Sequence, residues 1–449
     1  MKKYSKKDYL KELFTLSLPV IGEMSLNTLL GIADTIMISY FLGKAALSAS
    51  GFTNQIVFTL IFIFTAFNVG ATALIARNYG EKNYKMLNKV ASQSFFLNLI
   101  LGIILTIVAF TFKTQLFSIF DLSVIARKFQ VDYFKYIAFG ILPLFLNMNM
   151  TAILRGSGDT KTPLKITFIS NLLNIAGNYV LITGFGPFPE LGITGAAIST
   201  TISRVFAFIC YGKYLLNRNN KPHINFKNMF FTKQVFKPLI KISLPSALEQ
   251  TLMQLSFLTV GVIISKLDTT NEAGFRVIMN IESLSFMPAI GLSIAAATLT
   301  GKALGEKDKS KAYMFGKLTA LCGVIWGISV GLLFIFIPKP LLYAFTNDPL
   351  VIEIGISTLF IAGLNQPFLN YIISTSGAIR GAGETFSIML LTIFRLWIIN
   401  VPLTYYFIIV KSMNLKGVWL SELFSFTIAS FILLILFSKK KWLNKEITL

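Results

Sequence analysis

The stretch FFLNLILGIILTIVAFTF, residues 95–112, is an apolar run without a single charged side chain. As an α-helix, a run of this length can cross a hydrocarbon core of about 30 Å. Similar runs recur along the whole 449-residue chain, of which 54% is hydrophobic and 14% is charged. A soluble domain usually has about 25% charged residues. The sequence therefore predicts an all-α polytopic membrane protein.

The remaining composition argues against several function classes. The net charge of +21 is explained by Lys and Arg in loops that face anionic lipid, so no nucleic-acid partner is expected. Cys210 and Cys322 lie in apolar runs, and the single histidine, His223, lies in a polar linker. These residues form neither a disulfide framework nor a metal-binding pattern. We therefore expect no enzyme and no cofactor, and the basic start of the chain shows no cleavable signal.

Twelve spans can be drawn along the chain. Segments on the inner side then hold roughly three times as many Lys and Arg as those on the outer side, as the positive-inside rule requires. We expect a multi-pass protein of the cell membrane with both termini in the cytoplasm. The spans are 13–41, 52–76, 89–112, 131–154, 163–184, 193–216, 238–264, 273–301, 313–337, 351–379, 385–409 and 416–438.

Three motifs occur twice, at an offset of 225 or 226 residues. Each copy contains six spans, so the two copies have the same orientation in the membrane, as parallel repeats do. This predicts two six-helix lobes around a central cleft, with residues 1–216 as the N-lobe, 217–237 as a cytoplasmic linker and 238–449 as the C-lobe. The motif pairs are SLPVIGE at Ser17 with SLPSALE at Ser243, YGEKN at Tyr79 with LGEKD at Leu304, and LRGSGDT at Leu154 with IRGAGET at Ile379.

Four polar residues of the first lobe lie at one predicted depth. Asp34, Asn174, Asn178 and Thr200 each lie roughly 10–15 Å below the outer surface, at 1.5 Å per helical residue. A carboxylate inside a membrane is a functional candidate because its burial is costly. Together the four residues could hold a proton or coordinate Na⁺, which prefers oxygen ligands. The alternative is a purely structural role, since amides often hold helices together.

Other polar positions inside the spans have weaker assignments. Pro19 is expected to bend the first helix. Arg395 and Glu422 lie on consecutive spans and are expected to form a structural ion pair. Arg204 is a possible counter-ion of Asp34. The candidates for the substrate cleft are Glu249, Glu282, Arg204 and Met253.

Several motifs resemble those of the multidrug and toxic compound extrusion (MATE) family, in order and in both halves. They include DTIMISYFLG from Asp34, GATALIARNYGEKN from Gly70 and ESLSFMPAIGLSIAAATLTGKALGEKD from Glu282. The resemblance, which is to the DinF-like branch, implies a twelve-helix exporter driven by inward H⁺ or Na⁺. It also implies a cation site at Asp34, Asn174, Asn178 and Thr200. Asn178 departs from the pattern, because related members usually have Asp there.

The sequence thus predicts a cation-coupled multidrug antiporter. Its cargo is expected to be amphipathic, cationic organic compounds or drugs, exported by alternating access. The coupling ion is H⁺ or Na⁺, and the protein is expected to function as a monomer within the lipid bilayer. A flippase for a lipid-linked saccharide or another lipid is the alternative. An ion channel is disfavoured because no segment resembles a selectivity filter.

Overall fold

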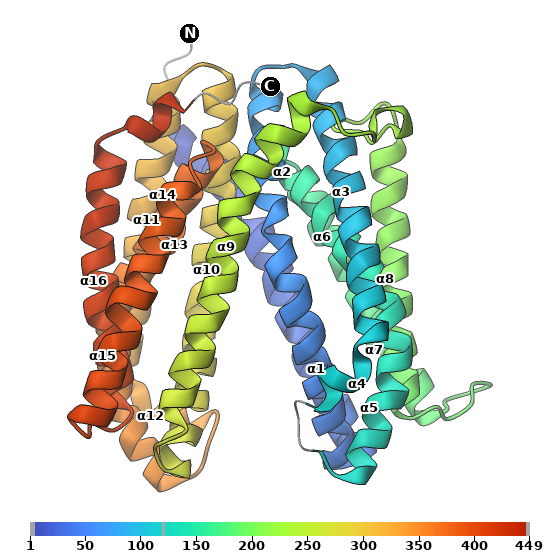
Figure 1. Ribbon diagram of the computed structural model, residues 1–449, viewed down its shortest axis with the longest axis vertical. Coiled ribbons are helices and arrows are strands. Elements are labelled where there is room, and N and C mark those ends of the chain that lie inside the picture. The colour runs from blue at the N-terminus through green and yellow to red at the C-terminus, as the bar shows by residue number, and fades with distance from the viewer. Residues whose placement is uncertain (1–4, 119–121, 446–449) are drawn as a thin grey trace. The chain divides into compact units, whose positions relative to one another are not determined.

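The computed structural model describes residues 5–118 and 122–445, and every regular element in these ranges is helical (Figure 1). The first half contains α1 (Lys6–Thr65), α2 (Phe67–Gly80), α3 (Tyr84–Thr111), α4 (Lys113–Ser118), α5 (Val124–Ile137), η1 (Ala138–Gly140), α6 (Ile141–Gly156), α7 (Lys161–Thr183) and α8 (Ile193–Leu216). A short 3₁₀ turn, η2 (Phe226–Asn228), lies in the polar linker.

The second half contains α9 (Lys233–Ile264), α10 (Thr269–Gly305), α11 (Lys309–Phe336), α12 (Pro338–Tyr343), α13 (Pro349–Gly381), α14 (Phe386–Ile393), α15 (Val401–Tyr405), α16 (Lys416–Ser438) and the 3₁₀ turn η5 (Lys441–Asn444). Two π-helical segments, η3 (Phe394–Asn400) and η4 (Tyr406–Val410), continue α14 and α15. Such segments are rare and often occur at functional sites.

Eleven helical segments of the described residues are long and apolar enough to cross a membrane. The first, Lys6–Thr59, belongs to α1, whose backbone departs from helical geometry at Gly43 (φ 77°, ψ −175°). Gly43 therefore lies between the first two predicted spans, 13–41 and 52–76, and separates them, because a residue with positive φ interrupts an α-helix. The all-α class with twelve spans is confirmed. The backbone around Pro19 keeps helical dihedral angles, and a bend there remains a prediction.

The chain folds into two compact units. The N-terminal unit comprises Gly22–Ser243, and the C-terminal unit combines the chain from Leu244 onward with the start of the chain up to Ile21. Both boundaries fall inside long helices, α1 and α9, close to the repeat prolines. Each unit therefore contains the first turns of a helix whose remainder belongs to the other unit. The lobe boundaries drawn from sequence, in the polar linker, stay a prediction.

Each unit has its own apolar core. In the N-terminal unit, α7 lies along α8, and α6 packs against α2 and α3. In the C-terminal unit, α13 packs against α10, α11 and α16. Leu13, near the start of α1, is fully buried in the C-terminal core. Many large apolar side chains elsewhere are exposed, as expected for helices that face lipid.

The repeated motifs fold into repeated turns. After Arg155, the backbone amide of Asp159 donates to the carbonyl of Leu154 at 3.0 Å. After Arg380, the amide of Glu384 donates to the carbonyl of Ile379 at 3.2 Å. The intervening glycines have φ values of +91° and +83°, and together these features define the Schellman ending of a helix. A tight turn therefore follows the helix at each of the two glycine-rich motifs.

The second motif pair also closes a helix in the same way in both units. Lys82 and Lys307 have φ values of +57° and +59°, although neither is glycine. Asn83 and Asp308 follow them and cap the next helices, α3 and α11, through their side chains. The two halves therefore repeat not only the helices but also the backbone geometry of the turns between them.

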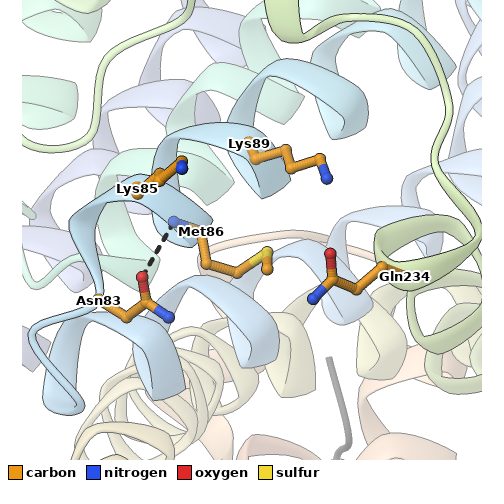
Figure 2. A pocket seen from close by; sticks show the side chains of 5 residues that line it. All are labelled: Asn83, Lys85, Met86, Lys89 and Gln234. Carbon is orange, nitrogen blue, oxygen red and sulfur yellow. Dashed lines mark hydrogen bonds between the residues drawn. The ribbon is translucent and has the colours of Figure 1, made fainter.

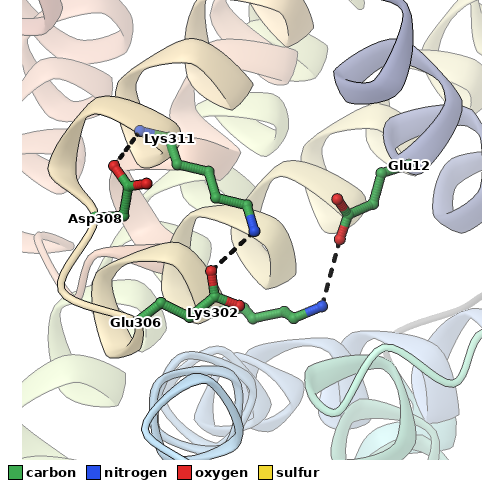
Figure 3. A network of polar contacts seen from close by, with 5 residues as sticks. All are labelled: Glu12, Lys302, Glu306, Asp308 and Lys311. Atoms are coloured by element: carbon green, nitrogen blue, oxygen red, sulfur yellow. Dashed lines mark hydrogen bonds and ion pairs between the residues drawn. The ribbon is translucent and has the colours of Figure 1, made fainter. Parts of the chain in front are cut away.

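Ion pairs tie the start of α1 and the turn before α11 to the C-terminal unit. Lys302 on α10 lies 3.3 Å from Glu12 on α1, and Lys311 lies 2.8 Å from Glu306 (Figure 3). The backbone amide of Lys311 also bonds to Asp308 at 2.8 Å. These partly exposed pairs each contribute little to stability. The pair of Lys302 with Glu12 joins the first turns of α1 to α10.

Candidate ion-coupling site

Asp34 lies on α1 in the N-terminal unit and faces α7. Its side chain is half-buried, and the Asn178 amide donates from Nδ2 to Asp34 Oδ1 at 2.6 Å. Asn178 itself is completely buried, and its own Oδ1 has no hydrogen-bond partner among the described residues. An uncharged donor therefore satisfies the carboxylate, while an acceptor oxygen beside it is left without a partner. A buried acceptor without a partner is unusual and indicates a place where a proton or cation can be accommodated.

Asn174 connects Asp34 to α8. In one orientation its amide donates to Thr200 Oγ1 at 3.2 Å and accepts from Asn178 Nδ2 at 3.3 Å. Turned by 180°, its nitrogen lies 2.9 Å from Asp34 Oδ1, and its oxygen accepts from the backbone amide and hydroxyl of Thr200 at 3.2 Å. The turned orientation satisfies both ends of the amide and is therefore the better bonded one. Two amides then donate to a single carboxylate oxygen.

The structure thus brings together all four residues that the sequence places at one depth. The helix spacing explains the arrangement, because positions 174 and 178 are one turn apart on α7. Asn171 is one turn earlier, but its amide donates to the carbonyl of Leu26 at 3.0 Å instead. Ser199 was missed by the sequence analysis. The hydroxyl of Ser199 donates to the backbone carbonyl of Asn174 at 2.8 Å and so joins α8 to α7 at the site.

Arg204 does not form an ion pair with Asp34. Among the described residues, no carboxylate lies within 4.0 Å of its guanidinium, and one guanidinium nitrogen, Nη1, is buried without a hydrogen bond. The guanidinium packs close to Gly140 of η1, near enough to Asp34 for its charge to act through space. Arg204, which the sequence suggested as the counter-ion of Asp34, therefore acts on the carboxylate only through space and not through a direct ion pair.

The site combines one carboxylate with two side-chain amides and a hydroxyl. A single carboxylate is present, and no group of three or more His, Cys, Asp or Glu side chains in the described residues could hold a metal. The nearest atoms to Asp34 Oδ1 are amide nitrogens, whose hydrogens would repel Na⁺. Hard cations need several oxygen ligands, and the spare oxygen of Asn178 is one of them. If Na⁺ binds, Asp34, Asn174, Asn178 and Thr200 would hold it, after the side-chain amides of the two asparagines turn their oxygens toward the ion.

The candidates for the substrate cleft have different surroundings. Glu249 is 5% exposed and lies 2.6 Å from Arg380, with a second bond of 2.8 Å from the hydroxyl of Thr392. Glu282 is 2% exposed and is enclosed within the C-terminal unit. Met253 is half-buried on α9. In this conformation the two acids are engaged inside their unit, and their contact with cargo remains a prediction.

The expected ion pair between Arg395 and Glu422 is not formed. The guanidinium of Arg395 lies over the ring of Phe426, 4.3 Å from its centroid, and no ion pair within 4.0 Å joins it to Glu422 in the described residues. The guanidinium instead makes a cation–π contact with Phe426, which lies one turn after Glu422 on α16.

A surface hollow of about 300 Å³ lies at the start of α3, away from these acids. Asn83, Lys85, Met86, Lys89 and Gln234 line it (Figure 2). The Asn83 side chain is occupied in capping α3, where it accepts from the Met86 amide at 3.2 Å. The remaining polar groups are surface side chains, so this hollow is not a candidate for the coupling site.

The fold and the buried polar site define a multi-pass helical membrane transporter built from two parallel repeats. The MatE family model matches residues 19–180 and 245–406, so that the two matches begin at the repeat prolines. The chain belongs to the MatE family, and it is a transporter rather than an enzyme. The family expected from sequence is confirmed, whereas the DinF-like branch remains a prediction.

Curated relatives match nearly the whole chain. The probable multidrug resistance protein NorM of Thermotoga maritima is 32% identical over 441 residues, which cover 97% of this chain and 94% of the relative. The multidrug resistance protein MdtK of Photorhabdus laumondii is 24% identical over 98% of this chain and 97% of its own length.

Solved structures of MATE transporters have the same fold. One, described as the outward-facing conformation of a multidrug resistance MATE family transporter, has a TM-score of 0.89 at 24% identity and covers 99% of this chain and 100% of that chain. Another, described as MATE in the bent conformation, has a TM-score of 0.89 at 25% identity, with coverage of 98% and 97%.

Proposed function

We propose that this protein is a multidrug efflux transporter that exports amphipathic organic cations in exchange for inward-moving protons at Asp34. The observation on which the proposal rests is a half-buried carboxylate in a membrane span that is bonded by uncharged amides and, within the described ranges, is not paired with a cation. The names of the full-length relatives support multidrug export. Both termini are assigned to the cytoplasm on the distribution of Lys and Arg.

The arrangement can exchange one positive charge for another. When Asp34 is ionised, the amide hydrogens of Asn178 and Asn174 stabilise the negative charge. When Asp34 takes a proton, that charge disappears, and the carboxyl O–H needs an acceptor. Asn178 can supply one if its amide turns so that the unpartnered Oδ1 replaces Nδ2 beside Asp34. Protonation therefore changes the bonds between α1 and α7. A ligand drives such a transporter only if it binds one arrangement better than the other.

Replacement of Asp34 with Asn tests this role. Asn is similar in size but cannot gain or lose a proton at neutral pH. In proteoliposomes with a pH gradient, we expect Asp34→Asn to abolish concentrative export of a fluorescent organic cation. Glu190→Gln, which removes an exposed acid in the loop before α8, is the matched control and should retain export. Undiminished gradient-driven export by Asp34→Asn would rule out the assigned role.

The coupling ion is tested separately in the unmodified protein. Export should follow a pH gradient at equal Na⁺ on both sides and should not follow a Na⁺ gradient at equal pH. The reverse result would assign the site to Na⁺ and would require the amides to turn their oxygens toward the ion. A lipid flippase would transport no organic cation under either gradient, and no observation in the described residues favours it.

A further inference from the structure

The linker between α8 and α9 lies against α3 of the N-terminal unit and is bonded to it at two places (Figure 1). The backbone amide of Asn225 donates to the Ser92 hydroxyl at 2.9 Å. Further along, the backbone amide of Thr232 donates to the Gln93 side-chain oxygen at 3.1 Å, and the Gln93 nitrogen donates to the Thr232 hydroxyl at 3.2 Å. Ser92 and Gln93 are completely buried. The linker is therefore held in a defined position on α3 and is not a free tether.

Between these two contacts, residues 226–231 form an aromatic tip. Phe230 is 77% exposed, and the rings of Phe230 and Phe231 lie 6.3 and 5.3 Å from that of Phe96 on α3, measured between centroids. Phe96 is the second residue of the apolar run 95–112, at the end nearest the start of α3. Aromatic side chains are enriched where the hydrocarbon core of a membrane meets the headgroups. The aromatic tip therefore lies at the level where α3 enters the hydrocarbon core.

A cationic hollow lies at the start of α3, next to the residues that follow the aromatic tip. It is the hollow of about 300 Å³ described above, to which α3 contributes Lys85 and Lys89, one turn apart, and α9 contributes Gln234 (Figure 2). Among the described residues, neither lysine has a carboxylate within 4.0 Å, and the nearby acid Glu81 lies 3.6 Å from Arg77 instead. The five described residues that line the hollow include two cations and no acid. The hollow therefore attracts an anion.

The cationic hollow and the aromatic tip are spaced along α3 like the parts of a phospholipid. Lys85, Lys89 and Phe96 are separated by four and seven residues, so they lie on one face of the helix. Lys89 lies about 10 Å from Phe96 along the helix axis, at 1.5 Å per residue. The headgroup layer of a bilayer is about 5–8 Å thick on each side. With Phe96 at the inner edge of this layer, the Lys89 ammonium is within reach of the phosphates.

We propose that the cationic hollow binds the phosphate of an anionic phospholipid from the adjacent leaflet, whose acyl chains lie on the aromatic tip. Lys85 and Lys89 attract the phosphodiester as point charges, and the Gln234 amide can donate a hydrogen bond to it. The volume of the hollow is at the lower end of the range for small-molecule sites, so it suits a headgroup and not a whole lipid. The exposed rings favour a lipid over a free phosphate ion, because only acyl chains use an apolar surface.

Lipid binding to the purified full-length protein tests the site. Phosphatidylglycerol is titrated into the protein in detergent, and bound lipids are counted by native mass spectrometry, in parallel with phosphatidylcholine that has the same acyl chains. Each lysine near an anionic lipid contributes about five- to sixfold in affinity. The double variant Lys85→Gln with Lys89→Gln should therefore bind phosphatidylglycerol about thirtyfold more weakly. Its affinity for phosphatidylcholine, which is zwitterionic, should stay the same.

The matched control is the double variant Lys161→Gln with Lys165→Gln. It removes two exposed lysines of the same spacing at the start of α7 in the same unit and should retain phosphatidylglycerol binding. An equal loss in both double variants would show that surface charge in general attracts the lipid, and would overturn the proposal.

A soluble competitor distinguishes a lipid from a free phosphodiester. Glycerophosphoglycerol is the headgroup of phosphatidylglycerol without its acyl chains, and at equal concentration it should not displace the bound lipid. Displacement would identify a site for free phosphodiesters and overturn the assignment to a lipid.

A variant that gains affinity keeps the test decisive if the lysine variants fold poorly. Gln234→Lys adds a third cation to the hollow and should raise the affinity for phosphatidylglycerol about five- to sixfold. Misfolding cannot produce such a gain. An unchanged or lowered affinity in Gln234→Lys would show that the lipid binds elsewhere.

Discussion

The two halves of the molecule share their turns and their ion pairs but not their unpaired acids. In the N-terminal unit Arg155 lies 2.9 Å from Glu23, and in the C-terminal unit Arg380 lies 2.6 Å from Glu249. These pairs join the repeated RG motifs to the acids that follow the repeat prolines. An arginine pairs with a glutamate at the same repeat positions in both units, so these pairs belong to the common scaffold.

The unpaired acids occupy unrelated positions. Val260 stands at the repeat position of Asp34, and Asn400 and Thr404 stand at those of Asn174 and Asn178. These last two residues bond to Ser421, with no carboxylate among the three. The C-terminal unit instead places its acid, Glu282, on α10. The comparison shows that the duplicated scaffold can hold a buried acid at more than one place.

The largest expected effect comes from breaking the shared ion pairs. Arg155→Ala and Arg380→Ala each leave a buried glutamate without its cation, which costs about 3–5 kcal/mol of unfolding free energy. The N-terminal variant should lose more, because Glu249 keeps its bond from the Thr392 hydroxyl, whereas the described residues provide Glu23 with no second hydrogen bond. Thermal unfolding in detergent measures both losses.

The control for the ion pairs is the double variant Glu23→Gln with Arg155→Ala. Removal of the charge should restore most of the lost stability, since the cost lies in the stranded carboxylate. Equal losses in the two single variants, or no recovery in the double variant, would contradict this explanation.

A medium effect is expected at the glycines that end α6 and α13. A Cβ at Gly381 would lie 2.2 Å from the Ala297 carbonyl oxygen, which is backbone and cannot move aside easily. At its repeat mate, Gly156, the nearest atom is the Thr72 carbonyl oxygen at 3.1 Å. Gly381→Ala should therefore cost about 1–3 kcal/mol, and Gly156→Ala should cost less. Chemical unfolding of the two variants compares them, and a larger loss for Gly156→Ala would contradict the expected order.

The smallest effect concerns the acids of the repeated turns. Burial raises the pKa of Glu384, but hydrogen bonds from Lys445 and Ser387 outweigh it and hold that pKa below its usual value. Glu384 therefore adds stability above the ordinary carboxyl range, and this stability is lost as the pH falls through its lowered pKa. Lys445→Met should reduce this pH-dependent part by under about 1 kcal/mol. The repeat mate, Asp159, bonds to the Tyr214 hydroxyl and has no lysine partner among the described residues, so Tyr214→Phe is the control.

The Glu384 prediction is checked by unfolding both variants at acid and neutral pH. A Lys445→Met profile parallel to that of the unmodified protein would show that Lys445 does not cause the lowered pKa.

Apolar runs and the distribution of Lys and Arg predicted the spans, recurring motifs predicted the repeats, and depth along the helices predicted that four polar residues lie together at Asp34. Distance along a helix fixes depth, and side chains at one depth on adjacent helices meet. The sequence does not fix which helix neighbours which, or the direction in which a side chain points. For this reason the pairing of Glu23 with Arg155 was missed, and Arg395 was assigned to Glu422 although it lies over Phe426.

The first turns of α1 and of α9 each lie in a different unit from the rest of the same helix. The helix that presents Asp34 begins, without a loop, among the core residues of the C-terminal unit, where Leu13 is buried and Glu12 is held by Lys302. Each of the two helices thus passes from one unit into the other without a break, α1 at 21–22 and α9 at 243–244.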